Sequence, residues 1–280
     1  MAKIMRYFIN LFFTIFLTLN IQHAWAAKLA IVIDDFGYRQ HNEEQIISFS
    51  PNITIAVLPN SPNAKRIATI AHDSGNDVII HLPMAPLGKQ PLEKDTLFPS
   101  MNEAEVNRIV TSAVAKVPYA IGVNNHMGSL MTSNLTGMTN VMKVLSHYSM
   151  FFLDSKTIGK TQVKTAGGDY NIPVLTRDVF LDDQQKESAI SQQFDLAVRL
   201  ARKNGVAIAI GHPHPQTVNV LRSKIANLPV DIELTKLSQL VMPVSIPAQA
   251  PVKRKATLKD ILGKCKKRIE EISNFKIEEE

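Results

Sequence analysis

The sequence contains only one cysteine, Cys265, so no disulfide bond can form within the chain. Stability must therefore come from an apolar core, and a composition of 45% hydrophobic and 20% charged residues is typical of a globular domain. Long apolar runs are also missing. The run at residues 7–21 is shorter than the roughly 20 residues that a membrane-spanning helix needs.

The beginning of the chain nevertheless has the pattern of a secretory signal. Lys3 and Arg6 precede the apolar run, and a small-x-small pattern ending at Ala26 follows it. We predict a cleaved signal peptide over residues 1–26 and a periplasmic or otherwise exported protein. The alternative is an N-terminal anchor that is not cleaved.

Excess positive charge is scarce in the central part of the chain, although the formal net charge is +6. The excess lies in Lys3 and Arg6 and in basic clusters at residues 253–255 and 264–268. Such clusters are usually solvated faces, and an exported protein meets little nucleic acid. We therefore expect no nucleic-acid partner.

The last 39 residues differ in composition from the rest. Prolines interrupt residues 242–256, which indicates a linker. Residues 257–280 place apolar side chains at helical spacing, which predicts an amphipathic helical tail. That tail either packs onto the preceding domain or docks to an envelope protein or a membrane surface.

The remaining residues, 27–241, alternate short apolar runs with stretches of helical spacing, as parallel sheets with crossover helices do. This pattern predicts an α/β fold, and the number of units favours an irregular (β/α) barrel of seven or eight parallel strands over an open doubly wound sheet. Strands are expected at 29–33, 53–58, 78–80, 120–123, 151–153, 172–175, 206–210 and 232–234. Helices are expected near 40–49, 61–73, 102–116, 135–148, 186–203 and 214–226.

Polar side chains follow these strands directly, and in parallel α/β folds the carboxyl ends of the strands form the ligand-binding face. The sequence therefore predicts a site there. Its candidate residues, in chain order, are Asp34, Asp35, His81, Asn125, His126, Asp154, Ser155, Arg177, Asp178, His212 and His214.

Imidazole and carboxylate groups together suit a divalent metal, most often zinc, and Asp35, His81 and His126 offer three ligands from three loops. A metal-bound carboxylate stays ionised while its neighbour accepts a proton, so we assign Asp34 as general base. The alternatives are hydrogen-bonded structural histidines and a turn at Asp34 and Asp35 that serves the backbone alone.

Five short blocks in this order resemble the divergent polysaccharide deacetylase family, a distant branch of the NodB-type carbohydrate esterases. The resemblance covers residues 28–241. The blocks are Ile31-Val-Ile-Asp-Asp-Phe-Gly37, His81-Leu-Pro-Met84, Asn125-His-Met-Gly-Ser129, Phe152-Leu-Asp-Ser155 and Gly211-His-Pro-His214.

The resemblance implies a distorted barrel that removes an acetyl group, with the help of a metal, from an N-acetylated polysaccharide or peptidoglycan-type glycan. It also implies Asp34 as base, Asp35 as ligand and a histidine as the acid, for which His212 is the first choice and His214 the second. The usual His-Ser/Thr-x-x-His pair is absent, so His126 would replace the second histidine.

Of the supporting residues, Arg177 and Asp178 either orient Asp34 through a charge pair or form a structural salt bridge. Our leading interpretation is an exported deacetylase-like hydrolase. The rival is a catalytically silent barrel that binds a glycan or a protein partner.

Overall fold

A computed structural model of the chain describes residues 26–241. The predicted linker and helical tail, and the predicted signal peptide except its last residue, lie outside the described residues. No helix within residues 26–241 is long and apolar enough to cross a membrane.

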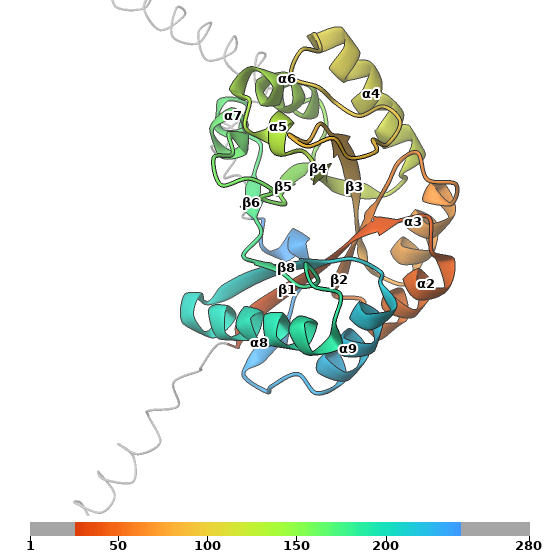
Figure 1. The fold of residues 1–280 in the computed structure, drawn as a ribbon, viewed down its shortest axis with the longest axis vertical. Coiled ribbons are helices and arrows are strands. Elements are labelled where there is room, and N and C mark those ends of the chain that lie inside the picture. Colours follow the sequence, from red (N-terminus) through yellow and green to blue (C-terminus); the bar gives the residue numbers. More distant parts are fainter. Residues whose placement is uncertain (1–25, 242–280) are drawn as a thin grey trace, which may run out of the picture. The chain divides into compact units, whose positions relative to one another are not determined.

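A parallel sheet forms the centre of this part of the chain (Figure 1). Its strands are β1 (Ala27–Phe36), β2 (Ile53–Val57), β3 (Asp77–Met84), β4 (Ala120–Met127), β5 (Phe151–Asp154), β6 (Val174–Thr176), β7 (Val179–Phe180), β8 (Val206–Gly211) and β9 (Ile232–Leu234). They pair in the order β6-β5-β4-β3-β2-β1-β8-β7, and β9 pairs with the start of β1.

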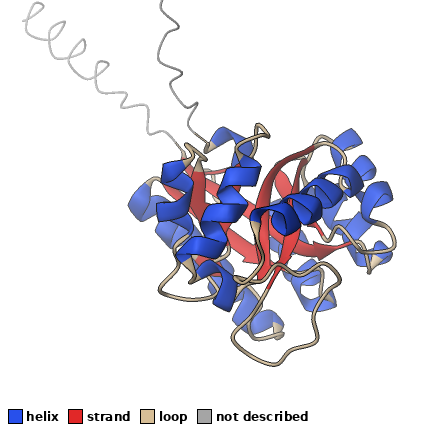
Figure 2. Ribbon diagram, turned by 90° about the horizontal axis from the view of Figure 1, so that it is seen from above, coloured by secondary structure: helices blue, strands red, loops and turns tan. Residues whose placement is uncertain are grey.

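Helices lie outside the curled sheet (Figure 2). They are α2 (Gln40–Phe49), α3 (Ala64–Asp73), α4 (Glu103–Lys116), α5 (Ser129–Thr132), α6 (Leu135–Leu145), α7 (Val163–Asp169), α8 (Glu187–Asn204) and α9 (Pro215–Ala226), and a 3-10 turn, Leu237–Gln239, follows β9. Helix α4 begins with a capping box in which Asn102 and Glu105 satisfy each other's backbone N–H groups.

The predicted parallel α/β class and irregular barrel are confirmed, with one qualification about closure. Among the described strands the pairing path ends at β6 and β7, so the sheet is an incomplete, curled barrel. The elements β7, α5 and α7 were not predicted. They contain two, four and seven residues, which is too short for a hydrophobic period to be recognised.

Two apolar clusters cover the two faces of the sheet. On β1, Leu29, Ile31 and Ile33 pack against the helices, whereas Ala30 and Val32 point into the barrel. Side chains alternate across a strand, so the next residue to point inward is Asp34. The same alternation continues from Ile79 to His81 on β3 and from Ile210 to His212 after β8. The inward face is thus apolar along the strands and polar at their carboxyl ends.

Candidate metal and catalytic site

Asp34 and Asp35 both contribute to this polar rim, although neighbouring residues of a strand normally face opposite sides. The register between β1 and β2 shifts between Ile33 and Phe36, and Asp35 has a left-handed backbone with φ of 60°. A bulge of this kind redirects a side chain, and aspartate tolerates the left-handed region better than most residues. Two adjacent carboxylates are thereby delivered to one site.

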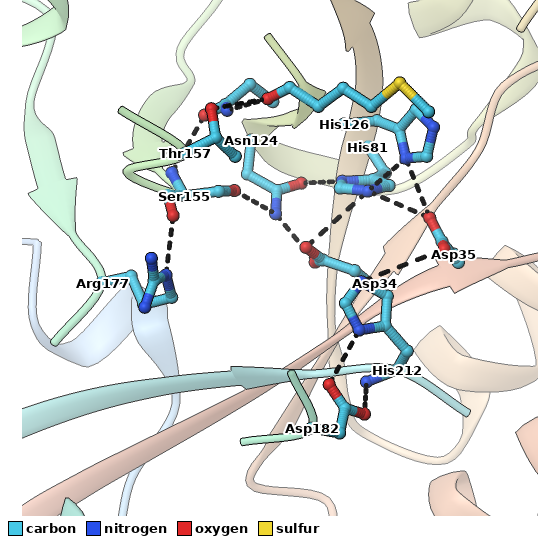
Figure 3. Close-up of polar contacts among 12 residues, drawn as sticks. Asp34, Asp35, His81, Asn124, His126, Ser155, Thr157, Arg177, Asp182 and His212 are labelled. Atoms are coloured by element: carbon cyan, nitrogen blue, oxygen red, sulfur yellow. Dashed lines mark hydrogen bonds and ion pairs between the residues drawn. The ribbon is translucent and has the colours of Figure 1, made fainter. Parts of the chain in front are cut away.

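Asp35, His81 and His126 bring three ligand atoms together (Figure 3). Oδ1 of Asp35 lies 3.2 Å from Nε2 of His81 and 3.0 Å from Nδ1 of His126. The two imidazole nitrogens are 3.1 Å apart. These atoms form a nearly equilateral triangle.

Asn124 determines which nitrogen of His81 faces this triangle. Its Nδ2 donates to Oδ1 of Asp34 at 2.8 Å, so its Oδ1 must accept from Nδ1 of His81, also at 2.8 Å. The proton of a neutral His81 is therefore on Nδ1, and Nε2 carries a lone pair. This is the arrangement in which a second residue orients a metal-binding histidine.

The chemistry of these donors fits a divalent cation. Oδ1 of the Asp35 carboxylate is buried without a well-directed N–H donor, and Nε2 of His81 turns a lone pair toward it. Ligands of a tetrahedral zinc are roughly 3.3 Å apart, given Zn–N and Zn–O bonds of about 2.0–2.1 Å. The observed spacings of 3.0–3.2 Å agree with that value.

The electrostatics of the site also favour a bound positive charge. Burial opposes charge on His81 and on Asp35. The charges of Asp34 and Asp35 nevertheless raise the pKa of His81. The imidazoles of His126 and His81 in turn hold the pKa of Asp35 well below its usual range. The cluster therefore requires positive charge, which either a proton on His81 or a metal cation supplies.

Asp34 lies beside the triangle and is only 2% exposed. Burial raises the pKa of its carboxyl, although His81, His212 and the hydrogen bond from Asn124 act in the opposite direction. Its Oδ2 is 3.7 Å from Nε2 of His81. A raised pKa makes a carboxylate a better proton acceptor near neutral pH.

His212 approaches the site from β8 and is held by Asp182 (Figure 3). Oδ1 of Asp182 is 2.9 Å from Nδ1 of the imidazole, while Oδ2 accepts from the His212 backbone N–H and from the Thr217 hydroxyl. Burial disfavours the imidazolium, but Asp182, Asp35 and Asp34 outweigh it and raise the pKa of His212 to about 9. His212 is thus protonated at neutral pH.

His214, the second candidate for the acid, lies in surroundings that disfavour its protonated form. Nη1 of Arg39 lies 2.7 Å from its Nδ1, and since arginine only donates, this nitrogen accepts. Burial and the nearby Arg39 lower the pKa of His214, although Asp182 acts against them. His214, Asp182 and His212 also lie close enough together to resemble ligands. Oδ1 of Asp182, however, lies 2.9 Å from Nδ1 of His212, and Nδ1 of His214 accepts from Arg39.

The other predicted supporting residues shape the loops around the site. Oδ1 of Asn125 accepts from the Ser155 N–H, and Asp154 accepts from the Lys156 N–H. The Ser155 hydroxyl lies 3.3 Å from Nδ2 of Asn124. These contacts fix the β5 end next to the β4 end.

Among the residues that the structure describes, neither Arg177 nor Asp178 forms the expected ion pair with Asp34, and the two form no salt bridge with each other. Burial lowers the pKa of Arg177, and the charge of Asp34 acts against it, so the two interact only at longer range. Arg177 donates instead to the backbone carbonyls of Ser155 and Lys156, and Asp178 accepts from the Ile208 N–H. Backbone groups left free after β5, and on β8 beside the start of β7, compete for these side chains.

Sequence reasoning missed Asn124 and Asp182 as site residues. Asn124 was visible as a polar residue at the end of a predicted strand, but its neighbour Asn125 was chosen. Asp182 follows β7, a strand of two residues that gives no period to read.

A cavity of about 190 Å³ opens beside this group of residues. Asp35, His126 and His212 line one part of it, so a small group entering the cavity meets the candidate ligands and the protonated imidazole together. The rest of the lining is Tyr38, Arg39, Leu58, Glu93, Pro213 and His214.

Comparison with known proteins shows what this chain is similar to. A family model described as divergent polysaccharide deacetylase matches residues 31–241. Uncharacterized protein YibQ of Escherichia coli K12 is 57% identical over 81% of this chain and 72% of its own length, and an uncharacterized protein of Haemophilus influenzae is 41% identical over 76% of each. A crystal structure of an uncharacterized protein from Agrobacterium tumefaciens C58 has the same fold, with a TM-score of 0.72 and 22% identity over 77% of this chain and 89% of that one.

Proposed function

Because the chain belongs to the divergent polysaccharide deacetylase family, we propose that it is a metal-dependent hydrolase that removes acetyl groups from an N-acetylated glycan of the cell envelope. The observation that carries the proposal is the convergence of Asp35, His81 and His126 between a buried carboxylate, Asp34, and a protonated imidazole, His212. Amide hydrolysis needs a proton acceptor and a proton donor at opposite sides of the reacting carbon.

Asp35, His81 and His126 would hold the cation. Once bound, a divalent ion such as zinc supplies Lewis-acid polarisation of the amide carbonyl and lowers the pKa of water. Asn124 contributes by keeping Nε2 of His81 free of a proton.

Asp34 and His212 move the protons. Asp34 accepts a proton from the attacking water while the water oxygen forms a bond to the acetyl carbon. When the C–N bond breaks, Nε2 of His212 donates its proton to the leaving nitrogen, so that acetate and a free amino sugar result. Asp182 stabilises the imidazolium before this step and keeps Nε2 directed toward the site.

Export is part of the same proposal, since an envelope glycan lies outside the cytoplasm. The charged start, the apolar run and the small residues that end at Ala26 support cleavage of a signal peptide. The mass of the mature protein recovered from the periplasm tests this directly.

The activity is tested with an N-acetylglucosamine oligomer, by measuring released acetate with and without added zinc. Asp35→Asn and His126→Ala should each abolish turnover and stoichiometric zinc binding, whereas the exposed His147→Ala should leave both unchanged. A purified protein that binds no metal, and whose glycan binding is the same in all three variants, would favour the silent glycan-binding barrel instead.

A further inference from the structure

A second, larger cavity adjoins the cavity of about 190 Å³ that Asp35, His126 and His212 line, which we call the site pocket. Its volume is about 520 Å³, and Tyr38 and Glu93 line both cavities, so the two share a wall. A volume of this size is in the usual range for a small-molecule site, roughly 300–1,000 Å³. The remaining lining residues come from the β2–α3 connection, the start of α3, the β3–α4 connection and the end of α4: Pro59, Asn60, Ser61, Pro62, Ala64, Lys65, Lys94, Ala115 and Lys116.

The charge of this cavity is mainly positive. Lys65, Lys94 and Lys116 all line it, and within the described part of the chain none of the three forms an ion pair. Nζ of Lys116 is fixed by Oδ1 of Asn60 at 2.5 Å. Three cations around one hollow repel one another, so an anion entering it is favoured.

The acidic groups nearby do not cancel this charge. Glu93, the only carboxylate in the lining, accepts a hydrogen bond from the Tyr38 hydroxyl at 3.0 Å. Asp95, just outside it, lies 3.4 Å from the Arg108 guanidinium. The contact of Tyr38 with Glu93 also forms the boundary between this cavity and the site pocket.

From this arrangement we propose that the second cavity binds the carboxylate of an acidic sugar residue adjacent to the residue that is deacetylated. The inference rests on the proposed function, because it places two neighbouring residues of one glycan in two cavities that share a wall. Lysine ammonium groups suit a carboxylate as point charges. Lysine binds phosphate as well as carboxylate, so the choice of a carboxylate follows from the proposed glycan substrate and not from the lining alone.

The test compares two probes by titration calorimetry. One is a tetrasaccharide of alternating N-acetylglucosamine and N-acetylmuramic acid, and the other is the same molecule with its carboxylates reduced to alcohols. Lys65→Gln combined with Lys94→Gln should weaken binding of the acidic probe about five- to tenfold, as expected for two partly exposed ion pairs, and change binding of the reduced probe less than about twofold. Lys164→Gln, an exposed lysine on α7, is the matched control.

The salt dependence of binding is the second part of the test. Binding of the acidic probe to the unmodified protein should weaken between low and high salt more steeply than binding to the double variant. Equal affinity for the two probes, or an equal loss of both in the double variant, would overturn the inference.

The two proposals fail separately. Preference for the acidic probe without acetate release would leave the carboxylate site standing and remove the hydrolase. Acetate release with equal use of both probes would leave the hydrolase standing and remove the carboxylate site.

Discussion

At the scale of single residues, the site separates its proton donors and acceptors by their surroundings. Asp34 is buried and has a raised pKa, whereas the imidazoles beside Asp35 keep that carboxylate ionised. Burial lowers the pKa of His212, whereas Asp182 raises it, so the imidazole keeps its proton. Adjacent residues of identical chemistry can therefore take different roles without any difference in local sequence.

Asp182→Asn should move the alkaline limb of the pH–activity profile to lower pH. The folded pKa of His212 is about 9, so the acid form persists up to that pH and is lost above it. Without the Asp182 charge the pKa falls, by about one unit or more, and the acid is lost earlier. NMR titration of the His212 ring gives the same shift without requiring turnover.

The exposed neighbour Asp183 provides the control for this experiment. Asp183→Asn should leave the limb and the His212 titration in place. An unchanged limb in Asp182→Asn would mean that His212 is not the proton donor.

Asn124→Ala should weaken zinc binding about 10- to 100-fold, as loss of a residue that orients a metal ligand usually does. The amide no longer selects the Nδ1 proton of His81, and its hydrogen bond to Asp34 is lost as well. Calorimetric titration with zinc measures the effect. The exposed Asn219→Ala on α9 should bind zinc like the unmodified protein, and equal affinity in both variants would contradict the role assigned to Asn124.

At the scale of elements, the sequence predicted most helices and strands because their apolar faces have clear periods. Helix α2 occurs at the residues predicted, and α4 and α9 each begin one residue later. Helix α3 begins at Ala64 and not near 61, because residues 61–63 form a turn first. The bulge at Asp35 could not be predicted, since it depends on how β1 pairs with β2.

The loop after β1 is held by a side chain that the sequence did not single out. Oε1 of Glu43, fully buried on α2, accepts from the backbone N–H groups of Gly37, Tyr38 and Arg39 at 2.6–3.0 Å. Gly37 has φ of 117°, and a Cβ there would lie 1.8 Å from the Ser61 hydroxyl. These contacts hold the loop that follows Asp35 in its observed backbone conformation.

Glu43→Ala should lower the free energy of unfolding by about 3 kcal/mol, because one buried and two part-buried N–H groups lose a charged acceptor. Urea denaturation measures this. Glu44→Ala, its exposed neighbour, loses only a surface ion pair with Arg66 and should cost less than about 1 kcal/mol. Similar losses in the two variants would show that Glu43 does not anchor the loop.

At the scale of the whole described domain, the site exists because the sheet curls. Pairing of β8 with β1 brings His212 to the edge where Asp35 lies, and β3 and β4 bring His81 and His126 to it (Figures 1 and 3). The sequence predicted that polar residues follow the strands, but their neighbours depend on the strand order. That order rests on long-range contacts that no local pattern encodes.

Residues 27–241 alone should fold with a Tm within about 2 °C of that of the mature chain. Helices already cover the outer face of the sheet, and an apolar cluster that includes the fully buried Leu237 fills the inner face, so no large apolar surface of this part needs the tail. Calorimetry of both chains checks this. Leu237→Ala in the shorter chain is the positive control and should cost about 2–5 kcal/mol. A large drop in Tm without residues 242–280 would instead indicate that the predicted helical tail packs onto the domain, which is the alternative that the amphipathic pattern leaves open.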